Sequence, residues 1–251
     1  MSAVTGERVT TSRAGFNPTW QRHVAAYALG ERFLGPGRIA DIGCGVGHSY
    51  TLLAPRETVG VDVDRDVLAG QRRETVAADM RSLPFGEAEF DGLIAVHSIE
   101  HVPEPERAMA EMKRVLKRGC SAVLVTPNRL TFAKPEEIID PYHYVEYDPG
   151  ELAGLCRRFF GSVELSGIFG SPRYRAIVAR EHEKLDALLR RDPLRLRRLL
   201  PRTLRQRLYD RRLGRERTGP DPEAEAIGLE DFSLATDPLE EALDLVAVCR
   251  D

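Results

Sequence analysis

The sequence predicts an α/β fold with a mostly parallel, doubly wound sheet, and two observations carry this prediction. Short apolar runs that are typical of buried strands alternate with segments of helical character, as in parallel strands joined by crossover helices. The first of these runs leads directly into a glycine-rich turn of the kind that brings backbone close to a ligand. The expected strands cover residues 38–42, 58–62, 122–126, 163–169 and 243–249, with short strands near 75 and 92.

Length and composition favour one compact enzyme-sized unit. The 251 residues, 42% of them hydrophobic and 30% charged, suffice for one sizeable domain, and two would be crowded. No apolar run is long enough to span a membrane, and the N-terminus lacks the hydrophobic stretch of a signal peptide, so we expect a cytoplasmic protein. Four widely separated cysteines indicate neither a disulfide framework nor a zinc knuckle.

The first expected strand ends in an acid and continues into three glycines at alternate positions, Gly43, Gly45 and Gly47. A helix is expected to begin near His48. The Gly-x-Gly-x-Gly spacing differs from a dinucleotide fingerprint, whose third glycine stands three positions on. Asp41 places a carboxylate under the turn, which repels a pyrophosphate and suits the ammonium group of an amino-acid moiety. We therefore expect a nucleotide-like ligand with a cationic, phosphate-free part.

Acids at the next two strand ends extend this site. Asp62 closes the second strand and can accept hydrogen bonds from two ribose hydroxyls. Asp79 can bind an adenine amino group, with Met80 against the ring. These residues predict an adenosine-shaped pocket along one edge of the sheet.

At this point the chain resembles the class I S-adenosylmethionine-dependent methyltransferases, in particular those of type 11. The resemblance implies S-adenosyl-L-methionine as cofactor and a Rossmann-like, seven-stranded sheet with helices on both faces, here with a helical insertion before the last strand. It implies cofactor contacts from Asp41, Gly43, Gly45, Gly47, Asp62, Asp79, Met80 and His97. The motifs that carry it are Asp41 to Gly47, Asp62, Ala78 to Met80 with Leu83 to Phe85, and Phe90 to Gly119.

The flanking segments complete the expected single domain. Residues 1–35 are expected to form a leading cap helix, residues 36–170 the cofactor-binding core, residues 171–240 a basic helical insertion and residues 241–251 the final strand. Asp148, Pro149 and Glu151 are typical of a helix start with a capping box. In the family the leading helix closes over the cofactor, so Arg22 and Tyr27 are candidates to touch its carboxylate.

The insertion is strongly basic. Residues 173–217 hold sixteen Arg or Lys against six Asp or Glu, whereas residues 218–251 hold one Arg against ten acids. Leucines at helical spacing between 185 and 208 predict short amphipathic helices whose leucine faces pack on the core. The arginines then form either a solvated face, partly paired with the acidic tail, or a surface for anionic acceptors, a membrane or nucleic acid. Nucleic acid is the weakest of these because the segment offers no aromatic platform for bases.

Methyl transfer to a hydroxyl needs a base at the carboxyl ends of the strands. The candidates are His143 with Glu146 first and His101 second. His97, Glu100 and His101 match the spacing of a zinc protease motif, but Pro103 follows too soon for the helix that such a motif requires. Some quinone-modifying methyltransferases that this region resembles carry a metal-assisting Glu-x-x-Glu-His, in which His97 replaces the first Glu; no bound metal is expected.

The acceptor is expected to be a hydroxyl of a sugar-containing small molecule or oligosaccharide. His143 to Tyr147 resembles a segment of methyltransferases in glycoconjugate pathways, and the arginine-rich region resembles a methyltransferase of the mycofactocin sugar chain. The alternatives are a phenol or quinone O-methyltransferase, a non-catalytic S-adenosylmethionine-binding regulator, and a tRNA methyltransferase.

Overall fold

The computed structural model describes residues 8–48, 50–192 and 194–251. Its centre is an eight-stranded sheet of order β3-β2-β1-β4-β5-β8-β6-β7. The first five strands pair in parallel, and β8 runs antiparallel to both β5 and β6. The strands are β1 Arg38–Ile42, β2 Glu57–Asp62, β3 Glu74–Ala77, β4 Phe90–Val96, β5 Leu116–Pro127, β6 Ser162–Gly170, β7 Phe232–Ala235 and β8 Asp244–Arg250.

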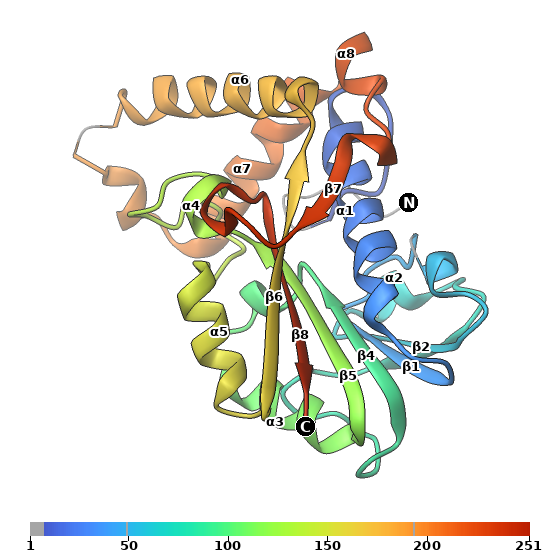
Figure 1. Cartoon of the computed structure of the whole chain (residues 1–251). Coiled ribbons are helices and arrows are strands. Elements are labelled where there is room, and N and C mark those ends of the chain that lie inside the picture. Colours follow the sequence, from blue (N-terminus) through green and yellow to red (C-terminus); the bar gives the residue numbers. More distant parts are fainter. Residues whose placement is uncertain (1–7, 49, 193) are drawn as a thin grey trace.

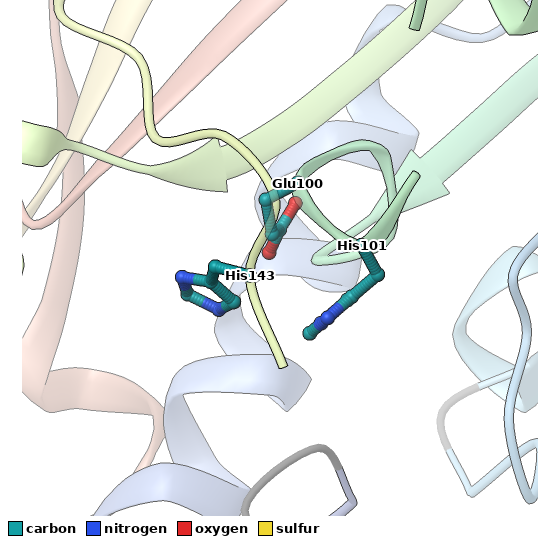
Figure 2. A group of neighbouring side chains, drawn as sticks. All are labelled: Glu100, His101 and His143. Atoms are coloured by element: carbon teal, nitrogen blue, oxygen red, sulfur yellow. The ribbon is translucent and has the colours of Figure 1, made fainter. Parts of the chain in front are cut away.

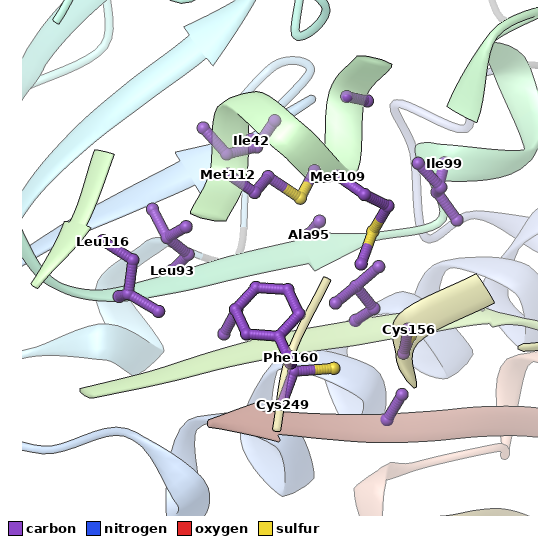
Figure 3. Packing of buried hydrophobic residues seen from close by; sticks show 14 of the residues in the cluster. Ile42, Leu93, Ala95, Ile99, Met109, Met112, Leu116, Cys156, Phe160 and Cys249 are labelled. Carbon is purple, nitrogen blue, oxygen red and sulfur yellow. The ribbon is translucent and has the colours of Figure 1, made fainter. Parts of the chain in front are cut away.

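Helices cover both faces of this sheet (Figure 1). Successive residues of a strand point to opposite faces, so Leu93 and Ala95 of β4 join one core cluster, whereas Ile94 and Val96 join the other. The first cluster includes buried residues of α3 and α5, among them the sulfur-rich patch in Figure 3. The helices are α1 Asn17–Gly30, α2 Arg65–Leu68, α3 Pro105–Val115, α4 Arg129–Phe132, α5 Pro149–Arg157, α6 Pro172–Leu189, α7 Arg202–Arg217 and α8 Pro222–Glu225.

The predicted α/β class, with a mostly parallel sheet and helices on both faces, is confirmed. The capping box at the start of α5 is also present: the Asp148 carboxylate accepts from the Glu151 backbone N–H, and the Glu151 side chain accepts from the Asp148 N–H. Leu152 and Cys156 of this helix are fully buried, as expected from their spacing.

The sheet has one strand more than expected. Phe232–Ala235 forms β7, which pairs antiparallel with β6 at the edge of the sheet. The expected helical insertion therefore consists of α6, α7 and α8, followed by a short edge strand. Four residues within an acidic segment were too few to stand out as a strand.

The prediction that an α-helix begins near His48 is wrong. Among the described residues between Gly47 and β2, which begins at Glu57, the helical element is a 3₁₀ turn at Tyr50–Leu53. Pro55 has no backbone N–H, and few residues separate the glycines from β2, so a longer helix has no room.

The expected packing of the insertion leucines on the core is also wrong. Leu185 and Leu189 are partly buried, but the other six predicted leucines are exposed: Leu188, Leu196, Leu199, Leu200, Leu204 and Leu208. Figure 1 shows α6 and α7, in orange, beyond the carboxyl ends of the central strands instead of against the sheet faces. Residues 1–7 of the expected leading segment lie outside the described residues, and α1, Asn17–Gly30, is the expected leading helix. No helix of the described ranges is both long and apolar enough to cross a membrane.

Candidate functional site

A cavity of about 330 Å³ lies at the carboxyl ends of β1, β2 and β4. Parallel strands bring these ends to one edge of the sheet, which is where open α/β sheets bind ligands. Seven of the predicted site residues line it: Gly43, Gly45, Asp62, Asp79, Met80, His97 and His101.

The glycines have the backbone angles that require glycine. The φ angles of Gly43, Gly45 and Gly47 are +74°, +53° and +68°, in the left-handed region that other residues rarely adopt. A Cβ on Gly43 would lie 2.4 Å from the Cβ of Ser98, so no larger residue fits there. Gly47 does not line the cavity and instead packs against Gln71. The turn therefore approaches the cavity through Gly43 and Gly45.

Asp62 is the best-positioned acid of the cavity. Its carboxylate is buried and accepts a hydrogen bond from the Gly45 backbone N–H at 2.9 Å, which ties β2 to the glycine turn. It also accepts from the Asp64 N–H, and a guanidinium nitrogen of Arg8 lies 3.6 Å away. A carboxylate offers about four acceptor sites, so capacity remains for ribose hydroxyls.

Asp41 lies beneath the turn and does not line the cavity. It is fully buried, where it accepts from the Tyr27 hydroxyl at 2.7 Å and faces the Arg73 guanidinium at 2.7 Å. Burial raises the pKa of Asp41, and Arg73 and Tyr27 offset this only in part. Both carboxylate oxygens thus have partners within the protein, and Tyr27 points to Asp41.

The Asp79 carboxylate is paired with Arg81. The Arg81 guanidinium forms a two-pronged ion pair with it, and this hydrogen bonding holds the pKa of Asp79 below its usual value. An adenine amino group would have to share Asp79 with Arg81. Met80 lies partly buried beside it on the cavity wall.

A second cavity of about 350 Å³ adjoins the first. Its walls come from α1, from the loops after β4 and β5, and from the inner faces of α6 and α7. Val9, His23, His97 and His101 line both cavities. A group in the first cavity can therefore meet a group in the second at these side chains.

Of the two predicted bases, His101 lies at this junction and His143 lines the second cavity beside it. The His143 Nδ1–H donates to Glu146 Oε1 at 2.9 Å, and both side chains are buried. Burial alone lowers the pKa of His143, but the Glu146 hydrogen bond and nearby carboxylates outweigh it, so the pKa lies above the ordinary 6.5. The His101 ring lies 5.0 Å from the His143 ring, centre to centre, and its Nδ1–H donates to the Tyr142 carbonyl. Nε2 of each histidine is thereby left as an acceptor.

Glu100 approaches the same two histidines (Figure 2). One donor atom from each of Glu100, His101 and His143 lies within 4.8 Å of the others, a set that could hold a metal ion. One Glu100 oxygen accepts from the Thr126 hydroxyl, and the other is buried without a hydrogen-bond partner among the described residues. His97 is not part of this set and instead contacts His23 and Asp244. The metal-assisting role that its spacing suggested is therefore not supported by its position.

His97 is part of a buried polar network behind the junction. Its Nε2 lies 2.9 Å from Asp244, its Nδ1 lies 3.1 Å from His23 Nε2, and His23 Nδ1 lies 2.9 Å from the Thr19 carbonyl. Burial lowers the pKa of His23 well below its ordinary 6.5. Asp244 also accepts hydrogen bonds from the Arg22 guanidinium, so this network joins α1 to β8.

Four residues of this site escaped sequence reasoning. All four come from segments with no motif, and only the fold brings them here: His23 and Tyr209 line the second cavity, Arg73 pairs with Asp41, and Asp244 contacts His97. Asp244 carried one usable signal, since an acid at the start of the apolar run 243–249 is either paired or functional.

Comparison with known proteins agrees with this architecture. The family model described as "Methyltransferase domain" matches residues 40–124. A Mycobacterium tuberculosis protein named "Probable S-adenosylmethionine-dependent methyltransferase" is 30% identical over 186 residues, covering 70% of this chain and 68% of that protein.

Solved structures share the fold at low identity. A Thermotoga maritima protein described as an S-adenosylmethionine-dependent methyltransferase, possibly a histamine N-methyltransferase, superposes with a TM-score of 0.63 at 16% identity, covering 94% of this chain and 92% of that one. The [4+2]-cyclase SpnF superposes with a TM-score of 0.57 at 17% identity, covering 99% and 88%. Because a cyclase shares the fold, the structural likeness alone does not fix the reaction. The identity and coverage of the mycobacterial relative do fix the family: the chain belongs to the class I S-adenosylmethionine-dependent methyltransferases, with S-adenosyl-L-methionine as methyl donor.

Proposed function

We propose that this enzyme transfers the methyl group of S-adenosylmethionine to a hydroxyl of a sugar-containing small molecule or oligosaccharide. The observation that carries the proposal is the junction of two cavities beside a buried histidine–glutamate pair. The cofactor takes the first cavity and the acceptor takes the second. The methyl group then crosses between them near His97 and His101.

The cofactor contacts follow the shape of the first cavity. Gly43 and Gly45 let the backbone approach the methionine part, and Asp62 accepts from the ribose hydroxyls. Asp79 and Met80 hold the adenine, and His97 lies at the methyl end. Asp41 and Gly47 act from beneath the turn by fixing its conformation.

His143 is the proposed base, and Glu146 holds it in the tautomer that leaves Nε2 free. Methyl transfer from a sulfonium is an in-line displacement, so alignment and exclusion of water do most of the work. A sugar hydroxyl must lose its proton as its oxygen attacks, and a buried imidazole with a carboxylate partner can take that proton. His101, which lines both cavities, is the second candidate.

The second cavity suits an acceptor with several hydroxyls. Its wall includes side chains that donate or accept hydrogen bonds, among them Arg22, Glu181, His182, Tyr209 and Arg212. Within this class the sugar chain of mycofactocin is the specific candidate, on the resemblance of the arginine-rich region. The Phe132 ring, stacked 5.0 Å from His143, offers an apolar surface that also favours the rival acceptor, a phenol or quinol.

The same proposal covers organisation and location. We treat residues 1–35, 36–170, 171–240 and 241–251 as cap, cofactor core, insertion and final strand of one domain, because the insertion supplies a wall of the cavity that the core opens. We place the enzyme in the cytoplasm, with direct access to S-adenosylmethionine.

Methyl-labelled S-adenosylmethionine tests the acceptor class. The protein is incubated with the label and with matched acceptors, an oligoglucoside and a phenol of similar size, and the products are identified by mass spectrometry and NMR. We expect a methyl ether on a sugar oxygen, and a fall in kcat of about 100-fold or more in His143→Asn. Methylation confined to the phenol would contradict the proposal and favour the rival enzyme.

A further inference from the structure

The loop before α7 and the outer face of α7 expose leucines and arginines together. We call this the arginine–leucine surface, comprising the exposed residues of 194–215. Leu194 and Leu199 are 78% and 80% exposed, so most of their apolar surface is in contact with water. Residues 194–217 also hold ten arginines against two acids, Asp210 and Glu216.

Helix α7 carries two leucines, Leu204 and Leu208, on its exposed side, among arginines. Leu204 and Leu208 are four residues apart, and so are Arg207, Arg211 and Arg215, which places these five residues on one side of the helix; all are exposed. The opposite side of the helix, including Tyr209, Leu213 and Arg217, lines the second cavity. A helix that served only to cover the cavity would expose a polar face instead.

The charge of this stripe is not neutralised within the described part of the chain. Arg207, Arg211 and Arg215 have no ion-pair partner among the described residues, whereas Arg195, Arg197 and Arg198 share Glu137. The acidic tail that could have paired with the stripe is used elsewhere. Its Glu223, Glu230 and Asp231 pair with Arg173 and Arg180 of α6.

We propose that the arginine–leucine surface binds the surface of a bilayer that contains anionic phospholipid. Leucines between arginines suit the boundary of headgroups and acyl chains, where the apolar side chains insert and the guanidinium groups meet lipid phosphates. A second copy of the chain is a poor partner, because two such basic surfaces repel each other. Nucleic acid is also a poor partner, because the aromatic residue of α7, Tyr209, faces the cavity instead of solvent.

This docking would bring the wall of the second cavity to the membrane surface. The same helix carries the lipid-facing stripe outside and cavity residues inside, so a membrane-bound acceptor would reach the cavity without crossing free solvent. This last step rests on the proposed role of the second cavity as the acceptor site, whereas the binding itself does not.

Vesicle co-sedimentation tests the binding without cofactor or acceptor. The full chain is mixed with vesicles of phosphatidylcholine alone or with phosphatidylglycerol, and the bound fraction gives a partition coefficient. We expect binding that needs phosphatidylglycerol and weakens with salt. In the triple variant Arg207→Gln, Arg211→Gln, Arg215→Gln the partition coefficient should fall about 100-fold, which corresponds to about 1 kcal/mol for each arginine. Leu199→Ser should weaken binding several-fold.

Matched controls carry the same changes elsewhere. Arg32→Gln, Arg118→Gln, Arg157→Gln removes three exposed arginines outside the surface, and Leu229→Ser removes another exposed leucine. Both controls should bind like the unaltered chain, and circular dichroism verifies that all variants are folded. Absence of binding to phosphatidylglycerol vesicles, equal loss in the controls, or binding to RNA but not to vesicles would overturn the inference. Because no methyl transfer is measured, the outcome is separate from that of the acceptor assay.

Discussion

At the scale of single residues, Asp62 links the cofactor cavity to the turn that shapes it. Its carboxylate already holds the Gly45 N–H and is buried at the end of β2. Hydrogen bonds to a charged acceptor are worth about 1.5–3 kcal/mol each, so two ribose hydroxyls bound by Asp62, as we propose, would make it a dominant cofactor contact.

Asp62→Ala should therefore raise the Kd for S-adenosylmethionine about 100-fold or more, measured by calorimetric titration. Asp66→Ala is the matched control, since Asp66 is an exposed acid four positions on. A Kd in Asp62→Ala within threefold of the unaltered value would remove Asp62 from the cofactor site.

Several residues of the site could be predicted from the sequence because local geometry dictates them. Gly43 and Gly45 need positive φ angles, and Asp62 terminates a strand whose end must face the ligand edge. The partners of Asp41 could not be predicted in this way. Arg73 reaches it only through the fold, and Tyr27 lines the first cavity while its hydroxyl donates to Asp41.

At the scale of elements, α1 is held to the sheet by a buried ion pair. The Arg22 guanidinium donates to both oxygens of Asp244 at the start of β8 and to the Leu243 carbonyl. Burial opposes the charge on Asp244, but Arg22 and His97 outweigh it and hold the pKa of Asp244 well below its usual range. The ion pair thus connects α1, which lies over the cavities, to β8, the last strand of the chain.

Asp244→Asn should lower the free energy of unfolding by about 3–5 kcal/mol, because it leaves a buried guanidinium without its counter-charge. A carboxylate whose pKa is depressed on folding stabilises the protein above its unfolded pKa of about 3.9 and loses that effect as the pH falls. The difference in the free energy of unfolding between the unaltered protein and Asp244→Asn should therefore be largest near pH 7 and decrease below about pH 4. Urea unfolding over this range measures it, with Glu240→Gln as an exposed control. An equal difference at all pH values would show that lost packing, not charge, is responsible.

Elements with strong local signals were predicted, and those set by tertiary context were not. The start of α5 has a complete capping box, and β8 is a continuous apolar run. Strand β7 forms because β6 has a free edge with which it can pair. The sequence of Phe232–Ala235 contains no feature that predicts this pairing. The insertion leucines have helical spacing, but spacing alone does not say whether a face meets the core or the outside.

At the scale of the whole molecule, the core and the insertion line two adjoining cavities. The core supplies the first, and α6 and α7 close the second over the loops that carry His101 and His143. The two spaces meet at side chains that line both. We propose that at this meeting point the His143–Glu146 pair takes the proton of a hydroxyl bound in the second cavity.

The pH dependence of kcat, compared between the unaltered enzyme and Glu146→Gln, tests this claim most directly. A base must be neutral, so kcat should rise with pH on a limb whose apparent pKa lies above 6.5, since Glu146 holds the pKa of His143 up. In Glu146→Gln the limb should move to lower pH, while kcat at its plateau falls because His143 is no longer oriented. If both enzymes show the limb at the same pH and the same plateau value of kcat, a group other than His143 takes the proton from the acceptor hydroxyl.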